Sequence, residues 1–174
     1  MTRVRAGRPG DARAISHIYV ESWRDAYAGI LPDHVLLRMS EQGEQASWRR
    51  MLARDELVLV AENGRGTVVA FGSWGASRVK GLGYSGEVYT LYVLPERQGQ
   101  GIGRRLLAGL FEALGAAGHK SAVIWVLADN PSRFFYEALG GRRVAERNER
   151  IWGVVLPQAA YGWRGLRLRP EGVR

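Results

Sequence analysis

Apolar residues recur along the chain with two different spacings, and these spacings predict where helices and strands lie. A spacing near 3.6 follows the turn-forming residues 9–11 and predicts a first helix that ends at Gly29 and Pro32. A second helical stretch is predicted over residues 33–54, with a break near Gly43. The first segment carries its apolar residues on one face, which is typical of a helix that covers a core.

Three strands are predicted next, because apolar, β-branched and aromatic residues fill residues 56–62, 67–77 and 86–94. Asn63 and Gly64 form the turn between the first two. The short connections predict a three-stranded meander.

Helical spacing returns after Pro95, where a leucine-rich helix begins at a run of glycines. Residues 121–127 form a short apolar strand. Because a helix separates it from the strand ending at Leu94, the two strands are predicted to run parallel. The alternation of helices and strands predicts a mixed α/β protein.

The last quarter of the chain contains one more helix and two strands. Asn130 and Pro131 are predicted to start the helix, with Asn130 as its N-cap, and Gly140 and Gly141 to end it. The terminal strands are predicted over residues 142–150 and 159–168, joined by a loop at 152–157.

Composition narrows the classes of protein that fit this pattern. With 174 residues, 46% of them apolar, we expect one domain over residues 1–174. The chain has no cysteine, which excludes disulfides, thiolate metal sites and thiol nucleophiles. Its three histidines are scattered, so no metal site is expected. The longest uncharged stretch, residues 151–163, is too short to span a membrane, and no signal peptide precedes the first helix; we expect a cytoplasmic protein without a membrane partner.

An excess of basic residues, 25 against 17 acidic ones, gives a net charge of +8 and favours anionic partners. Nucleic acid and a phosphate-bearing small molecule both meet that condition, although surplus arginine also serves solubility. The arginines gather at one turn and are otherwise scattered, without an interleaved aromatic and basic surface. We therefore expect no nucleic-acid partner.

One stretch combines several features of an anion site: VYTLYVLPERQGQGIGRRLL, residues 88–107. A strand passes through a glycine-rich turn directly into a helix, whose N-terminus presents unpaired N–H groups and partial positive charge. Glycine lets the backbone approach a ligand because no Cβ intervenes. The residues that build this cradle are Gly99, Gly101 and Gly103, with Arg97, Arg104 and Arg105 beside them.

Two common phosphate motifs do not fit this turn. A dinucleotide-binding GxGxxG motif would need glycine at the position of Arg104 or of Leu106. A Walker loop would need a lysine followed by Ser or Thr after the glycines, and none is present.

The remaining pattern is QxxGxG, formed by Gln98, Gly101 and Gly103, and it closely resembles motif A of the GCN5-related N-acetyltransferases. Residues 125–141, WVLADNPSRFFYEALGG, resemble motif B of the same superfamily. The resemblance covers about the last two thirds of the chain. SWRDAYAGILP, residues 22–32, is similar to a stretch in many bacterial members.

This resemblance implies an α/β, three-layer fold of the GNAT type, in which helices cover both faces of a central mixed sheet. It also implies a splayed central pair of parallel strands, 86–94 and 121–127, with acetyl-CoA as co-substrate. The diphosphate would lie on the turn at 98–104, and the pantetheine arm would pair with backbone at Leu91 and Val93. The implied cofactor-binding residues are Leu91, Val93, Gln98, Gly99, Gln100, Gly101, Gly103, Arg104, Asn130 and Tyr136.

The resemblance also implies roles in catalysis. Glu87, eleven residues before Gln98, matches the general base of the histone-acetylating branch and would act through water. Its alternative role is that of an ordinary solvated carboxylate. Tyr136 matches the tyrosine that protonates the departing thiolate or holds its sulfur, and its alternative is a core aromatic. For Asn130, helix capping alone is the alternative to contact with the pantetheine.

The acceptor site is defined least by the sequence. Trp23, Tyr27 and Glu87 are candidates for binding the amine, although such residues also serve in packing or at the surface, and Trp23 falls on the apolar stripe of the first helix. The resemblance implies direct acetyl transfer to a primary amine of a small molecule, peptide or protein, and it allows a homodimer. The alternative is a non-catalytic acyl-CoA sensor on the same fold.

Overall fold

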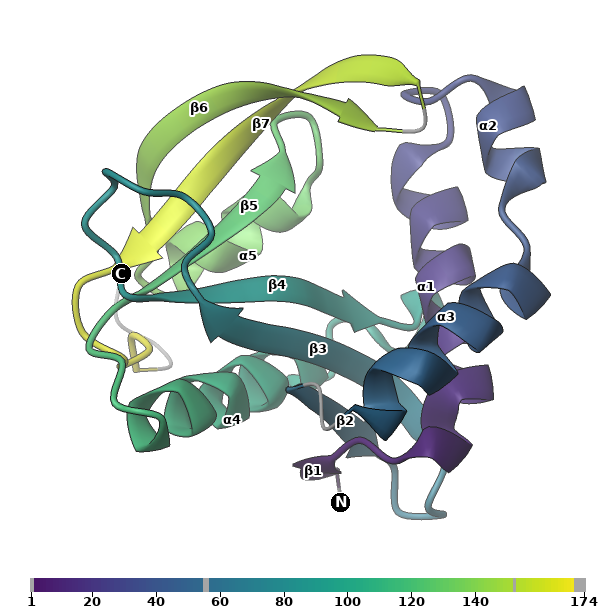
Figure 1. Cartoon of the computed structure of the whole chain (residues 1–174), viewed down its shortest axis with the longest axis horizontal. Helices are drawn as coiled ribbons and strands as arrows, with labels where there is room; N and C mark the ends of the chain where they lie inside the picture. The colour runs from purple at the N-terminus through teal and green to yellow at the C-terminus, as the bar shows by residue number, and fades with distance from the viewer. Residues whose placement is uncertain (1, 55–56, 152, 171–174) are drawn as a thin grey trace. The chain divides into compact units, whose positions relative to one another are not determined.

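The computed structural model describes residues 2–54, 57–151 and 153–170 (Figure 1). These residues form two compact units, and each is described by itself. The first unit comprises the chain up to Ser73 together with Thr90–Gly109, and the second comprises Trp74–Tyr89 together with Leu110 onward. A single domain over residues 1–174 stays a prediction. Among the described residues, no helix has both the length and the apolarity that crossing a membrane requires.

Seven strands form one mixed sheet, in the order β1-β2-β3-β4-β5-β7-β6 (Figure 1). The strands are β1 (Arg3–Ala6), β2 (Val58–Glu62), β3 (Val68–Ala76), β4 (Gly86–Val93), β5 (Ala122–Leu127), β6 (Arg142–Ile151) and β7 (Val154–Trp163). The helices are α1 (Ala12–Tyr27), α2 (Asp33–Arg38), α3 (Glu41–Ala53), α4 (Ile102–Ala116) and α5 (Ser132–Ala138), with short 3-10 turns at Pro9–Asp11 and Pro95–Arg97. This arrangement confirms the predicted mixed α/β sheet.

The predicted parallel pair is also confirmed, because β4 runs parallel to β5. Their pairing extends from Gly86–Ala122 to Val88–Ile124, and among the described residues of the second unit it does not continue to Tyr89 and Trp125. A ladder this short lets two neighbouring strands separate beyond it, as the resemblance implied.

The first unit is built around aromatic side chains that α1 and α3 contribute. The ring centroid of Tyr19 lies 5.7 Å from that of Trp23 and 6.4 Å from that of Trp48. Phe71 of β3 packs against Trp48 at 5.0 Å and against Tyr92 of β4 at 5.5 Å. Large rings of this kind bury much apolar area and hold helices and strands in one core.

The second unit contains an antiparallel sheet of β5, β7 and β6, with a close contact at Gly162 of β7. A Cβ at Gly162 would overlap the ring of Tyr84, so glycine is required there. On α5, Tyr136 lies among aromatic rings, 6.2 Å from Tyr161 and 6.3 Å from Trp163 between centroids.

Three sequence predictions of element bounds were wrong. β1 was not predicted, because its four residues include two arginines and carry little apolar signal. The break in the second helical stretch comes at Met39 and Ser40, where the Ser40 hydroxyl caps α3 by accepting from the Gly43 N–H, so Gly43 lies within the helix.

The third correction concerns the last strand, which covers Val154–Trp163 instead of 159–168. Pro157 suggested a loop, yet it lies inside β7. Its carbonyl points toward Ala128 and accepts a hydrogen bond from the Ala128 N–H at 2.9 Å. At that position the nitrogen of Pro157 also points away from β6, so the β6–β7 ladder needs no donor from it.

Arg5 of β1 joins two carboxylates of the first unit. Its guanidinium donates to Asp11 at 2.8 and 3.0 Å and to Glu62 at 2.9 Å. The bond from Arg5, together with the N–H of Arg8, holds the pKa of Asp11 below its ordinary value of 3.8.

We predict that acid weakens this contact. A lowered pKa means that the ionised form of Asp11 stabilises the folded protein above about pH 4, and that this stabilisation is lost as the pH falls through the lowered value. Asp11→Asn should reduce the free energy of unfolding by about 1–3 kcal/mol at pH 7 and should flatten its decline in acid. Urea unfolding from pH 7 to pH 2 measures both effects, and an unchanged pH slope in the variant would contradict the assignment.

Candidate functional site

The glycine-rich turn between β4 and α4 leaves a row of backbone donors without partners. Gly99 and Gly101 have φ angles of 71° and 76°, in the left-handed region that favours glycine. A Cβ at either position would meet nothing within 4 Å, so this backbone borders open space. Among the described residues, the N–H groups of residues 99–103 donate to no other group of the chain. The turn therefore presents a row of backbone amides that are free to bond a ligand or water.

Hydrogen bonds close to the turn hold it in this shape. The N–H of Gln98 donates to the carbonyl of Pro95 at 3.2 Å, and its side-chain amide donates to the carbonyl of Val93 at 3.3 Å. The side-chain amide of Gln100 donates to the carbonyl of Glu96 at 3.4 Å. Both glutamines thus brace the turn with their side chains.

Positive charge surrounds this turn. α4 begins at Ile102, and its N-terminus adds a partial positive charge. Arg97 and Arg105 are exposed, and Arg104 is half-buried. The turn therefore combines free amides, a helix N-terminus and arginines, which together suit an anion such as a diphosphate.

Leu91 and Val93 lie half-buried in the last part of β4. The carbonyl of Val93 accepts from the hydroxyl of Ser22 at 3.4 Å in addition to the Gln98 amide. A coenzyme amide that paired with this carbonyl would have to share or displace these bonds.

Trp23 and Tyr27, the aromatic candidates for the acceptor site, are packed into the first unit. Trp23 is 6% exposed, and its indole N–H donates to the hydroxyl of Tyr92 at 3.0 Å. Tyr27 is 4% exposed, with its ring 4.5 Å from that of Trp23. Burial also raises the pKa of the neighbouring Tyr19. The two candidates therefore support the wall of the first unit, and most of their surface is covered.

Glu87 is the most buried charged residue among the described side chains, with 1% of its surface exposed. The guanidinium of Arg78 donates to Oε1 of Glu87 at 2.7 and 3.2 Å, and the N–H of Arg78 donates to Oε2 at 2.8 Å. Three donors thus occupy three of the roughly four lone-pair sites of the carboxylate. The solvated carboxylate considered as an alternative is not what the structure contains.

Arg78 is itself held in place, although 60% of its side chain is exposed. Its guanidinium lies 4.1 Å from the centroid of the Tyr89 ring, and the Tyr89 hydroxyl donates to the carbonyl of Ala76 at 2.6 Å. Burial and the charge of Glu87 raise the pKa of Tyr89. Sequence reasoning missed Arg78, for which the only signal was a basic residue in the loop preceding the strand of Glu87.

Tyr136 and Asn130 lie in the second unit, as Glu87 does. Tyr136 on α5 is 4% exposed and packs among aromatic rings. Asn130 is half-buried, and its side-chain oxygen accepts from the N–H of Ser132, the first residue of α5, at 2.9 Å. The N-cap position of α5 is Pro131, one residue later than predicted. The residues of the cradle, with Leu91 and Val93, belong to the first unit.

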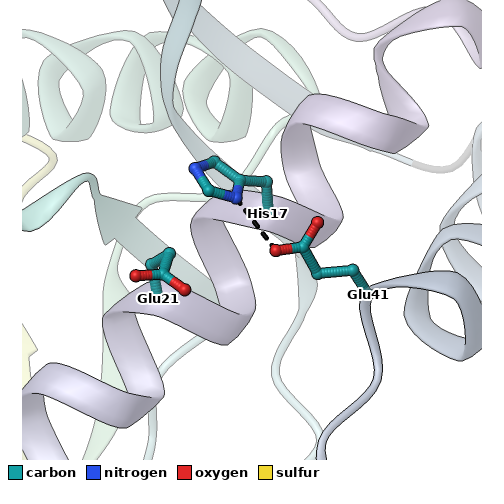
Figure 2. Close-up of side chains that lie close together, drawn as sticks. All are labelled: His17, Glu21 and Glu41. Atoms are coloured by element: carbon teal, nitrogen blue, oxygen red, sulfur yellow. Dashed lines mark hydrogen bonds and ion pairs between the residues drawn. The ribbon is translucent and has the colours of Figure 1, made fainter.

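A group of possible metal ligands also occurs on the first unit. His17 and Glu21 of α1 and Glu41 of α3 place one ligand atom each within 4.8 Å of the others, and His17 Nδ1 lies 3.0 Å from Glu41 Oε1 (Figure 2). The sequence did not indicate this group, because Glu41 lies 24 residues beyond His17 and only folding brings them together. The side chains of His17 and Glu41 are 50% and 43% exposed and are joined by the hydrogen bond, while Glu21 is half-buried.

Comparison with known proteins places this site in a family. Residues 79–152 match the model of the FR47-like protein family. An uncharacterized N-acetyltransferase of Bacillus subtilis, YuaI, is 39% identical over 95% of both chains. A GCN5-related N-acetyltransferase structure from Rhodopseudomonas palustris has a TM-score of 0.72 at 23% identity, covering 93% of this chain and 94% of that one.

A further solved structure with this fold is yncA of Salmonella typhimurium, a putative acetyltransferase determined with acetyl-CoA. Its TM-score is 0.67 at 24% identity, covering 99% of this chain and 96% of that one. The chain described here belongs to the GCN5-related N-acetyltransferase superfamily and is by class an acetyl-CoA-dependent acyltransferase.

Proposed function

We propose that the protein transfers an acetyl group from acetyl-CoA directly to a primary amine of a small molecule, peptide or protein. The observation that carries the proposal is the row of free amides at residues 99–103. Such donors at a helix N-terminus suit a diphosphate, because each N–H can bond an anionic oxygen without moving. The coenzyme of yncA carries a diphosphate of this kind.

The arginines near the turn strengthen this proposal. Arg97 and Arg105 are exposed and carry full charges beside the amides, so they can attract a strongly anionic coenzyme. Gln98 and Gln100 brace the backbone, while Gly99 and Gly101 keep its approach clear. In this proposal Gly103, in the first turn of α4, contributes its N–H to the same row. In this proposal Leu91 and Val93 offer backbone groups to the pantetheine, and Asn130 contacts it as well.

Transfer proceeds without a covalent enzyme intermediate, because the chain has no cysteine to carry the acetyl group. The amine nitrogen attacks the thioester carbonyl, and the carbon–sulfur bond then breaks. Glu87 takes the amine proton through water, and Tyr136 gives a proton to the departing thiolate. Trp23 and Tyr27 support the acceptor side of the first unit in this proposal.

The second candidate is a member of the same family that binds acyl-CoA as a sensor and has lost the transfer step, and the Glu87–Arg78 contact is the observation that favours it. Arg78 occupies three of the roughly four lone-pair sites of Glu87, which leaves few sites to receive an amine proton. To act as a base, Glu87 would use its remaining lone pair or part from the Arg78 side chain, much of which is exposed. A sensor would bind the coenzyme and release no CoA over a panel of amines.

Gly101→Val tests the cradle. The added side chain would project into the space that borders the free amides, so we expect coenzyme affinity to fall at least about tenfold. Gly118→Val is the matched control, because Gly118 also has a positive φ, 91°, with open space around it, at the other end of α4. Isothermal titration with CoA compares the two variants. Native affinity in Gly101→Val would remove the cradle from the proposal.

Glu87→Gln tests the base. It keeps the shape of the side chain but cannot take a proton, so we expect kcat to fall about 10²- to 10⁴-fold with little change in coenzyme affinity. The rate of CoA release with the best amine of a panel gives kcat, and thermal unfolding gives stability. A lower stability with native kcat would make Glu87 a structural partner of Arg78 only.

Tyr136→Phe tests the acid, with Tyr161→Phe as its control. Both tyrosines are buried in the same aromatic group, and Tyr161 donates its hydroxyl to Glu137 at 3.1 Å. We expect Tyr136→Phe to slow thiol release about 10²-fold or more while Tyr161→Phe retains most activity. Equal rates in the two variants would assign Tyr136 to packing.

A further inference from the structure

The outer edge of β6 has no partner strand among the described residues. β6 is the last strand of the sheet, paired on its inner side with β7 (Figure 1). Its residues alternate between exposed and half-buried side chains, and Glu146 is 69% exposed. A ten-residue edge strand with free backbone groups is a template for pairing with another strand.

The β6–β7 register shows which residues of β6 have their backbone N–H and C=O groups pointing away from β7, toward the free edge. Asn148 lies opposite Pro157, which has no N–H and whose carbonyl points toward Ala128 of the β5 side. Asn148 therefore exchanges no ladder bonds with β7, and its N–H and C=O face the free edge. Because this orientation alternates along an antiparallel strand, Glu146 and Arg150 also face their backbone groups outward.

A second copy of the chain can pair antiparallel with the outer edge of β6, with a two-fold axis through Asn148. In that arrangement the charges of the two β6 strands are complementary. In that register Glu146 lies opposite Arg150 of the second copy, and Arg147 lies opposite Glu149. The two-fold axis repeats each pair, which gives four opposite-charge pairs around a neutral Asn148–Asn148 centre. Opposite charges on facing strand positions are stabilising, and like charges are destabilising.

Neighbouring registers are unfavourable. A two-fold axis through Glu146, Arg147, Glu149 or Arg150 would place each of these residues opposite its own copy, with like charges in contact. An axis between two residues would set outward-facing backbone against inward-facing backbone, which breaks the ladder. Asn148 is the one uncharged residue of the segment 146–150, so a single register combines matched charges with matched backbone.

Contacts with β5, with β7 and within β6 hold Arg147 and Glu149 in position. The Arg147 guanidinium lies 4.0 Å from the centroid of the Trp125 ring and donates to Gln158 at 2.8 Å. Its Nη2 lies 3.1 Å from Glu149, so the two charges already lie side by side. In the antiparallel register, the same pair from a second copy completes a square of alternating signs.

We propose that the outer edge of β6 is a homodimerisation surface, on which two copies pair antiparallel about Asn148 and continue the sheet. The occupant is a second copy because the charge pattern is complementary to itself. The same pattern disfavours unrelated strands, which would leave these charges unmatched. Because the charges are partly exposed, salt should weaken the dimer.

Sedimentation velocity of the full chain, over a wide range of protein concentration, tests the proposal. We expect a concentration-dependent dimer at low salt. Glu146→Arg places arginine opposite Arg150 twice and should weaken the dimer about tenfold or more. The double variant Glu146→Arg with Arg150→Glu restores opposite charges and should return dimerisation to near the native level. Failure of the double variant to restore it would overturn this register.

Asn148→Pro tests the backbone part of the pairing. It removes an outward N–H and leaves the β6–β7 bonds unchanged, so we expect a monomer with native circular dichroism. Asn148→Ala, which keeps the N–H, should still dimerise. Two results would overturn the proposal. The first is a native protein that stays monomeric at every concentration, which would mean that the edge charges only deter association. The second is a dimer that neither Glu146→Arg nor Asn148→Pro weakens. Coenzyme binding is measured separately, so failure of the proposed activity leaves this test intact.

Discussion

The bend between β4 and α4 is the constraint on which the proposed chemistry depends. Two glycines with positive φ turn the backbone so that the N–H groups of residues 99–103 have no partner within the described chain. Backbone donors that stay unpaired cost free energy when they are taken out of water, so such a row is retained where water or an anionic ligand can bond it. Substitution at Gly99 or Gly101 would strain the backbone even though open space surrounds both positions. The bend therefore explains together the glycines, the glutamines that brace the turn and the arginines that surround it.

A second constraint arises at Glu87, where a charge is almost completely buried. Burial of an isolated carboxylate is strongly unfavourable, and removal of its partner leaves the charge uncompensated. Arg78 meets this requirement with its guanidinium and its backbone N–H, while Tyr89 covers the guanidinium from one face. The contact stabilises the loop after β3 and occupies three of the roughly four lone-pair sites of the carboxylate. The structural role of Glu87 and the proposed role as a base thus require the same lone pairs, so a kinetic measurement and a stability measurement are both needed to separate them.

Much of the fold was predictable because local patterns determined it. Glycines at 99 and 101 followed by a leucine stripe indicated the turn and α4, and Asn130 before Pro131 indicated the start of α5. The errors occurred where tertiary contacts override local preference. Pro157 predicted a loop, yet β7 accommodates it, because its carbonyl accepts a hydrogen bond from Ala128, which follows β5. The partners of Glu87 and of His17 could not be predicted, because the first depends on how the loop of Arg78 folds back toward β4 and the second, Glu41, lies 24 residues beyond His17. Trp23 and Tyr27 fit both an apolar stripe and an acceptor wall, and their burial supports the first interpretation directly.

Pro157, which made β7 difficult to predict from the sequence, also determines which backbone groups of β6 face the free edge of the sheet. Because Pro157 cannot donate toward Asn148, the alternation of ladder bonds along β6 has a single phase, and that phase assigns Asn148 to the outer edge. In this phase the central Asn148–Asn148 pair is a hydrogen-bonded one, in which the N–H and C=O groups of the two copies bond each other. The self-complementary charges and the position of the proline are independent features of the sequence, one on each strand of the hairpin. The charges select the register and the proline determines that its central pair is hydrogen-bonded, which distinguishes a pairing surface from an edge that is merely charged.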